Sequence, residues 1–206
     1  MQELIIHPNN PQARLIEQAV LSLRKGGIII YPTPCAYALG CHLGDYEAAE
    51  RLRSIRQVDK HHFFTLMCRN LSEISTYATV DNWVFRLLKT HTPGDYTFVL
   101  RASQAVPKKM MQEKRKTIGL RIPSNPIAQA LLEELNEPIL STTLMMPGEK
   151  EPLSDPYEIV DRLEGLVDIF INVGPGSIEA TTVIDLSRDK PYVIREGKGD
   201  VGPFLD

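Results

Sequence analysis

Strand-like and helix-like sequence patterns alternate along this chain of 206 residues, and the alternation limits the possible folds more than any other feature. The stretch "PQARLIEQAVLSLRKGG" (11–27) opens at a proline, closes at two glycines and repeats apolar residues at helical spacing, as helices do. The run "GIIIYPT" (27–33) is typical of a buried strand. Similar patterns predict helices at 45–57, 80–94, 125–137 and 155–165, and strands at 63–68, 96–102, 116–124, 138–146, 167–174, 180–187 and 191–197.

Interleaved helices and strands predict an α/β fold in which helices cover a twisted sheet. The last three predicted strands have no helix between them, so part of the sheet should be antiparallel and the sheet therefore mixed. No shift in composition divides the chain, and a hydrophobic share of 43% suits a globular protein with its own core. We therefore expect a single domain that spans residues 7–206.

Nothing in the sequence indicates a membrane-spanning or exported protein. The start, "MQELIIHPNN", lacks the features of a signal peptide, and no apolar run approaches the roughly 20 residues that cross a bilayer. The three cysteines form no C-x-x-C pair, which predicts neither a disulfide framework nor a zinc site. The adjacent His61 and His62 point in different directions on most backbones and make poor shared metal ligands. We expect a cytoplasmic monomer or weak dimer without a metal site.

Charge is unevenly distributed along the chain. The segment 101–121 carries seven basic residues and one acid, Glu113, which gives a net +6 inside a chain of net charge −3. One interpretation is an ordinary solvated face, and the other is a positive field that attracts nucleotide phosphates or RNA. Under the second interpretation, the expected RNA-binding residues are Lys108, Lys109, Lys114, Arg115 and Lys116.

The familiar phosphate-binding and nucleophile motifs are absent from the sequence. The chain has no G-x-x-x-x-G-K-[ST] loop, no G-x-G-x-x-G after a strand and no G-x-S-x-G turn. Hydroxyl and guanidinium side chains stand instead at the ends of predicted elements, and such groups hold phosphates and carboxylates by geometry. Each alone is more typical of a surface or capping position, and none is assigned a catalytic role.

Thr33 stands between two prolines, directly after the apolar run "GIIIY". It belongs either to an ordinary exit from a strand or to a ligand site at the carboxyl end of a strand, where open α/β sheets bind ligands. Pro32 fixes its own φ, and Pro34 pushes Thr33 toward extended conformations. The position therefore suits a small polar contact that must be held rigidly.

Taken in order, several short motifs resemble those of the YrdC/YciO family. They are "YPT", "R-x-x-D-K" after a helix, "PG-x-x-TFVL", "TIGLR-x-P-x-x-PIA-x-x-LL" and "TTVIDL…VIREG". The resemblance runs from about Leu15 to Gly197, and "FTLMCR" and "KRKTIGLRIPSNPIAQALL" are most similar to the YciO branch. The best-known members of this family are threonylcarbamoyl-AMP synthases.

The resemblance implies a single YrdC-like α/β domain with a concave basic cleft. It also implies a reaction in which L-threonine, bicarbonate and ATP form threonylcarbamoyl-adenylate and pyrophosphate, toward threonylcarbamoyladenosine in tRNA. ATP is then a substrate, and Mg²⁺ arrives with the nucleotide rather than in a protein cage. The implied partners are ATP, L-threonine, and double-stranded RNA or tRNA.

The family pattern implies residue roles as well. Thr33 and Arg121 fall on positions that meet L-threonine. The nucleotide-binding positions are Arg56, Thr117, Thr143, Thr182 and Arg195. Lys60, in the loop after the second helix, is a further expected nucleotide-binding residue.

Several positions depart from the family pattern. Ser54 replaces a lysine, Gln57 a proline and Met145 an asparagine, and Pro34-Cys35 replaces an acidic or polar pair. Each charge-assisted hydrogen bond removed in this way costs on the order of 1.5–3 kcal/mol, although Lys60 would restore the charge missing at Ser54. Two interpretations stay open: a synthase with weak turnover, or a non-catalytic protein that keeps the fold and binds double-stranded RNA or tRNA.

Overall fold

The computed structural model describes residues 1–59, 62, 64–111 and 116–205. Its strands are β1 (Gln2–Ile5), β2 (Ile29–Tyr31), β3 (Ala38–His42), β4 (Thr65–Met67), β5 (Tyr96–Arg101), β6 (Thr117–Arg121), β7 (Ile139–Thr143), β8 (Ile169–Asn172), β9 (Thr182–Asp185) and β10 (Tyr192–Arg195). Its helices are α1 (Ala13–Arg24), α2 (Tyr46–Arg56), α3 (Leu71–Tyr77), α4 (Asn82–His91), α5 (Pro126–Leu135), α6 (Pro156–Leu163) and the short 3-10 helices η1 (Lys108–Met110) and η2 (Gly202–Phe204).

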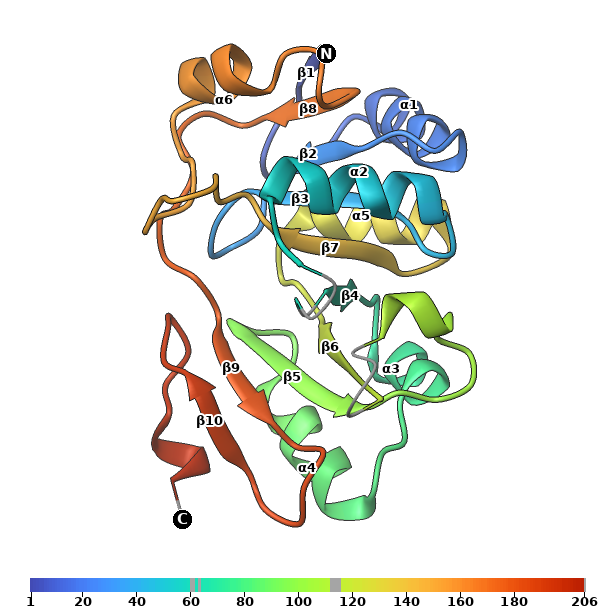
Figure 1. The fold of residues 1–206 in the computed structure, drawn as a ribbon, viewed down its shortest axis with the longest axis vertical. Helices are drawn as coiled ribbons and strands as arrows, with labels where there is room; N and C mark the ends of the chain where they lie inside the picture. The colour runs from blue at the N-terminus through green and yellow to red at the C-terminus, as the bar shows by residue number, and fades with distance from the viewer. Residues whose placement is uncertain (60–61, 63, 112–115, 206) are drawn as a thin grey trace.

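The strands form one mixed sheet in the order β1-β8-β2-β3-β7-β4-β6-β5-β9-β10, which runs the length of the molecule (Figure 1). β9 and β10 pair antiparallel, as do β5 and β6, whereas β8 pairs in parallel with both β1 and β2. The predicted α/β fold with a mixed sheet is confirmed. Because β1 belongs to the sheet, the folded unit begins before residue 7, which corrects the domain start expected from the sequence.

Helices α2 and α5 begin at capping residues that can be recognised in the sequence. The Asp45 side chain accepts a hydrogen bond from the N–H of Ala48 at 2.9 Å and begins α2. Asn125 caps α5 in the same way, with Pro126 at the first helical position. α2 ends at Arg56 because Gln57 adopts a left-handed conformation, with φ at 48°, that proline cannot adopt.

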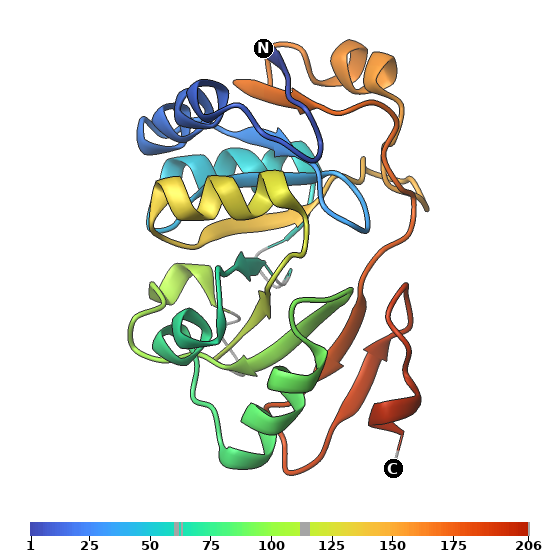
Figure 2. The ribbon, with the colours of Figure 1, turned by 180° about the vertical axis from the view of Figure 1, so that it is seen from behind.

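Helices cover both faces of the sheet, but unequally. On one face, α2, α3, α4 and α6 share a large apolar cluster with strands from β2 to β9. On the other face, α1 and α5 lie side by side and form a second cluster with β1, β8, β2, β3 and β7 (Figure 2). This second cluster leaves the same face uncovered over β6, β5, β9 and β10.

The alternating direction of side chains along β5 and β6 determines which residues lie on the uncovered face of the sheet. Phe98 and Leu120 point into the first apolar cluster, because successive side chains on a strand point to opposite faces. Val99, Gly119 and Arg121 point the other way and line a cavity. Among the described helices, none combines the length and apolar composition that would be needed to cross a membrane.

Candidate functional site

The cavity has a volume of about 260 Å³ and lies where β7 and β4 separate. β7 pairs with β3 along all five of its residues, but its pairing with β4 reaches only Ser141. Thr142 and Thr143 therefore extend beyond β4, and both line the cavity. The walls come from both halves of the sheet, with the loop after β2 on one side and β4, β5, β6, β9 and β10 on the other.

Five of the eight ligand-binding residues predicted from the sequence line this one cavity. Each belongs to a different segment: the loop after β2, and the last residues of α2, β6, β7 and β10. In that order they are Thr33, Arg56, Arg121, Thr143 and Arg195. Sequence reasoning thus places distant residues in one site, and their individual binding roles stay predictions.

The remaining three predicted residues do not line the cavity or are not described. Thr117 is buried, and within the described residues its Oγ1 has no hydrogen-bond partner. Thr182 is buried as well, since its hydroxyl donates to the carbonyl of Gly199 at 2.5 Å and accepts from the N–H of Gly197 at 2.9 Å. The Thr182 hydroxyl is thus taken up by the backbone after β10, whereas Thr117 lies on the same face of β6 as Gly119 and Arg121, and its nucleotide-binding role stays a prediction. Lys60 lies outside the described residues.

Arg121 is a guanidinium buried without a counter-ion in the described part of the chain. Only 6% of the residue is exposed, and its Nη atoms lie 3.4 Å from Thr33 Oγ1 and 3.2 Å from Cys35 Sγ. Its Nε has no hydrogen-bond partner among the described residues, and no ion pair to a carboxylate is found for Arg121 within them. An unpaired buried charge is costly, so this side of the cavity is suited to a carboxylate or another anion.

Thr33 is held in place by its own loop. Its hydroxyl donates to the carbonyl of Ala36 at 2.6 Å and accepts the N–H groups of Cys35 and Ala36 at 3.2 Å each. Side-chain bonds of this kind from threonine to nearby backbone fix a turn. The hydroxyl is thereby fixed beside Arg121, two residues after the end of β2.

Two further arginines line the same cavity. Arg56 donates from Nη1 to the carbonyl of Met145, and Arg195 donates to the carbonyl of Thr181 at 2.9 and 3.1 Å. Burial lowers the pKa of both guanidinium groups, but arginine stays charged at neutral pH. None of the described residues that line the cavity is Asp or Glu, so these walls carry positive charge alone and attract anions.

Cys35 and His62 also line the cavity, and neither has a binding role predicted from the sequence. Burial raises the pKa of the Cys35 thiol to about 11, although the nearby Arg121 opposes the shift. Burial also lowers the pKa of His62 to about 4, with help from Arg56 and Arg53, and its Nε2 lies 3.1 Å from Thr142 Oγ1. At neutral pH, a thiol and an uncharged imidazole therefore add hydrogen-bonding atoms without adding charge.

The positions that depart from the family pattern differ in where they lie. Ser54 is exposed on α2, where its hydroxyl donates to the carbonyl of Glu50 at 3.0 Å, and it does not line the cavity. Met145 does line the cavity, next to the carbonyl that fixes Arg56. Of these two departures, only Met145 changes the chemistry of the wall directly.

Part of the basic segment packs beside α2. Lys109 places its Nζ 4.8 Å from the centre of the Tyr46 ring, and its carbonyl accepts a hydrogen bond from Arg53 at 3.5 Å. Lys108 and Lys116 are exposed, while Lys114 and Arg115 lie outside the described residues. In the described part of the chain, no three His, Cys, Asp or Glu residues come together in a way that would hold a metal ion.

Comparisons with known proteins show related sequences and structures. The family model Sua5_yciO_yrdC, described as "Telomere recombination", matches residues 22–197. The uncharacterized protein YciO of Escherichia coli K12 is 60% identical over 204 residues, 99% of each chain, and the crystal structure of E. coli YciO superposes with a TM-score of 0.96. The threonylcarbamoyl-AMP synthase of Vibrio vulnificus YJ016 is 28% identical over 159 residues, 76% of this chain and 84% of its own.

A more distant structure shares the fold. The crystal structure of P. abyssi Sua5 complexed with L-threonine has a TM-score of 0.87 at 23% identity. The match covers 96% of this chain and 58% of that protein. At this level of identity the likeness concerns the fold alone.

The low pKa of His62 leads to a prediction about stability. Below about pH 6.5 an unfolded chain binds a proton at this histidine, whereas the folded protein does not until about pH 4, so the fold loses stability as pH falls through that window. We expect the free energy of unfolding of the wild type, minus that of His62→Gln, to decrease from pH 6.5 toward pH 4 and to stay constant above pH 7. Denaturant unfolding of both proteins at each pH measures this difference in free energy. A difference that stays constant from pH 7 to pH 4 contradicts the prediction.

Proposed function

The chain belongs to the Sua5/YciO/YrdC family, and on this premise we propose that it is an ATP-using enzyme of the threonylcarbamoyl-AMP synthase type. In the proposed reaction, the threonine amine bonds to the carbon of bicarbonate as water leaves. A carbamate oxygen then bonds to the α-phosphorus of ATP as pyrophosphate leaves. The adenylate would serve threonylcarbamoyladenosine formation in tRNA. The observation that carries the proposal is the cavity wall of three arginines, with no carboxylate among its described residues.

The wall that contains Arg121 is the proposed site for the amino acid. Its guanidinium is buried, and its Nε has no partner among the described residues, which suits the bidentate binding of a carboxylate. Thr33 offers a fixed hydroxyl beside it. The P. abyssi Sua5 structure, which shares the fold, was determined in complex with L-threonine.

The part of the cavity lined by Arg56, Arg195 and Thr143 is the proposed site for the nucleotide phosphates. Arg56 and Arg195 are held there by backbone carbonyls, and Thr143 adds a hydroxyl at the end of β7. In this proposal Mg²⁺ arrives with ATP. Because the described lining residues include no carboxylate, the chain's own contribution is positioning of the reactants and neutralisation of their charge.

These assignments predict a division of roles between two arginines. We expect Arg121→Ala to weaken L-threonine binding about 10- to 100-fold and to leave ATP binding nearly unchanged, since charged hydrogen bonds contribute on the order of 1.5–3 kcal/mol. Arg195→Ala should do the reverse. Calorimetric titration with each ligand measures both affinities, and Arg14→Ala, an exposed arginine on α1, is the matched control.

Two outcomes would count against this division. Equal losses of both ligands in both variants would show that the two arginines do not serve separate ligands. A folded wild type that binds no ATP at millimolar nucleotide would remove the proposed enzyme altogether.

A second candidate function is binding of nucleotide and RNA with little turnover. The observation that favours it is Met145, which lines the cavity where the family pattern has a hydrogen-bonding asparagine. A thioether is at best a weak acceptor and cannot donate to a phosphate. The closely similar E. coli protein YciO is itself uncharacterized, and its name therefore favours neither candidate.

Restoring the family residue tests whether Met145 limits turnover. We expect Met145→Asn to raise pyrophosphate release about tenfold, as one added hydrogen bond in the transition state would. Ser54→Lys should help less, because Ser54 faces solvent on α2. The assay contains L-threonine, bicarbonate and ATP, with each omitted in turn. A wild type that already turns over as fast as Met145→Asn would rule out the second candidate.

We also propose that the basic segment binds double-stranded RNA or tRNA. Lys108, Lys109 and Lys116 are exposed on the described part of it, and Lys114 and Arg115 add charge in the sequence between them. Lysines that neutralise phosphates release counterions, so affinity should fall as salt rises and should depend little on RNA sequence.

Salt titration of RNA binding is the corresponding test. Replacing Lys108, Lys109 and Lys116 with glutamine should weaken binding and reduce the slope of log affinity against log salt by about 0.9 for each phosphate that the protein no longer neutralises. Lys150→Gln, an exposed lysine outside the segment, is the control. Binding that is equal at low and moderate salt would exclude this surface.

A further inference from the structure

The segment that follows β10 lies directly against the sheet beside the cavity. We call residues 196–200 the strap. The N–H of Lys198 donates to the carbonyl of Ala180 at 2.9 Å, and Thr182 bonds to the backbone of Gly197 and Gly199. A Cβ on Gly197 would collide with the carbonyl oxygen of Ala180, so the approach is too close for another residue. The backbone of the strap is therefore fixed.

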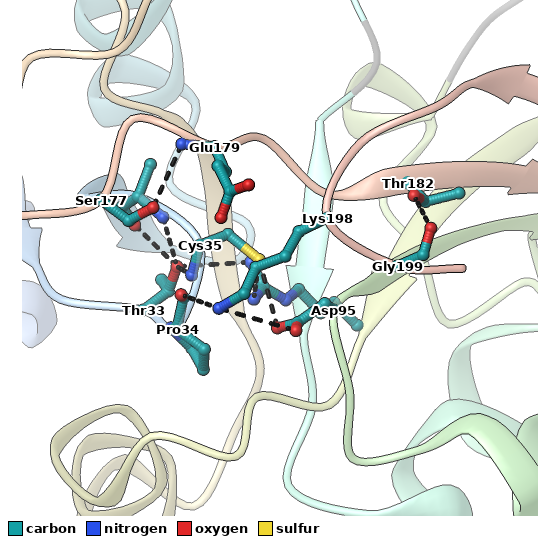
Figure 3. A network of polar contacts seen from close by, with 11 residues as sticks. Thr33, Pro34, Cys35, Asp95, Ser177, Glu179, Thr182, Lys198 and Gly199 are labelled. Atoms are coloured by element: carbon teal, nitrogen blue, oxygen red, sulfur yellow. Dashed lines mark hydrogen bonds and ion pairs between the residues drawn. The ribbon is translucent and has the colours of Figure 1, made fainter. Parts of the chain in front are cut away.

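Lys198 reaches from this fixed strap to the loop after β2 (Figure 3). Its Nζ donates to the carbonyl of Pro34 at 2.8 Å and lies 3.7 Å from Asp95 Oδ2. The lysine and aspartate side chains are 34% and 29% exposed, so their ion pair contributes little by itself. The charge-assisted bond to Pro34 is the stronger contact. Asp95 strengthens the link, because its Oδ1 also accepts the Cys35 thiol at 3.3 Å.

The loop that Lys198 holds is the one that faces Arg121. Thr33 and Cys35 flank Pro34, and they are the two side chains that the Arg121 guanidinium contacts. A displacement of the Pro34 carbonyl would therefore move the Thr33 hydroxyl away from the guanidinium. Lys198 itself does not line the cavity, and it acts on the site only through this loop.

We propose that Lys198 is a positioning residue for the amino-acid site, which holds the 33–35 loop against Arg121 and so sets the affinity for the carboxylate ligand. The inference rests on the proposed function, because it takes the ligand at Arg121 to be L-threonine. It goes beyond that function by assigning a specific control of affinity to the strap. Arg56 and Arg195 are held by the backbone carbonyls of Met145 and Thr181 rather than by the 33–35 loop, so the nucleotide side does not depend on this contact.

The test compares Lys198→Met and Lys198→Arg with the wild type by calorimetric titration of L-threonine and ATP. Lys198→Met keeps the length of the stem but removes the donor, so L-threonine should bind about tenfold more weakly, as expected when one charge-assisted hydrogen bond is removed. ATP affinity should stay within about twofold, since, among the described residues, the carbonyls that hold Arg56 and Arg195 make no hydrogen bond with the Lys198 side chain. Lys198→Arg should recover most of the loss, and Lys190→Met, an exposed lysine before β10, should change nothing.

Labelling of Cys35 by a thiol reagent gives a second readout that needs no ligand. All three cysteines are buried, at 2% exposure for Cys35 and 0% for Cys41 and Cys68, and only Cys35 lies in the loop. Lys198→Met should speed its labelling, and peptide mapping assigns the modified cysteine. Asp95→Asn should speed it as well, because the thiol loses its charged acceptor.

Each result decides for or against the proposal. Unchanged L-threonine affinity in Lys198→Met, or an equal loss of L-threonine and ATP binding, overturns it. If the wild type binds no L-threonine, the proposed function fails and the labelling rate alone decides. In that case, faster labelling of Cys35 in Lys198→Met supports the positioning role, and an unchanged rate removes it.

Discussion

The pairing of β7 with its two neighbours is the constraint on which the rest of the structure depends. β7 joins the half of the sheet beneath α1 and α5 to the half that carries β4, β6, β5, β9 and β10. Its pairing with β4 covers only three residues, whereas its pairing with β3 covers five. The sheet is therefore continuous through its middle yet open at one end of β7, and the cavity lies at that opening. A longer β4 would pair with Thr142 and Thr143 and close it.

The buried positive charges around the cavity reduce the stability of the fold. Three guanidinium groups line it without a carboxylate among the described lining residues, and two of their Nε atoms have no hydrogen-bond partner in that part of the chain. An anionic ligand would relieve both the mutual repulsion and the unsatisfied donors. Binding and stability are thus coupled through Arg56 and Arg121.

Helix ends that depend on hydrogen bonds within a single element could be predicted from the sequence. Strand β3, which depends on contacts between distant segments, could not. The caps at Asp45 and Asn125 were predictable because each bonds within its own helix. The sequence pattern does not indicate β3, because Gly40 interrupts the run of strand-forming residues. The glycine is explained only in the structure, where Tyr31 and Ile139 pack against it and leave no room for a side chain.

Within the site, the arginines could be grouped from the sequence by their place at the ends of elements. Adjacent threonines could not be separated in the same way, because one residue along a strand reverses the face. Thr181 lines the cavity, whereas Thr182, its neighbour in β9, points inward.

The order of the strands also separates the two ends of the chain. β1 forms one edge of the sheet, while the segment after β10 ends near the opposite edge (Figure 1). At that edge, Phe204 packs against the rings of His91 and Tyr96 on the cavity-bearing half, so η2 is a structural part of it. An affinity tag or fluorescent protein attached before Met1 would emerge far from the strap. The same attachment at the other end would follow closely after η2 and would place a mechanical load on the segment that positions Lys198. Fusion at the two ends is therefore not equivalent, and the amino-terminal end is the suitable one for immobilising this protein in binding measurements.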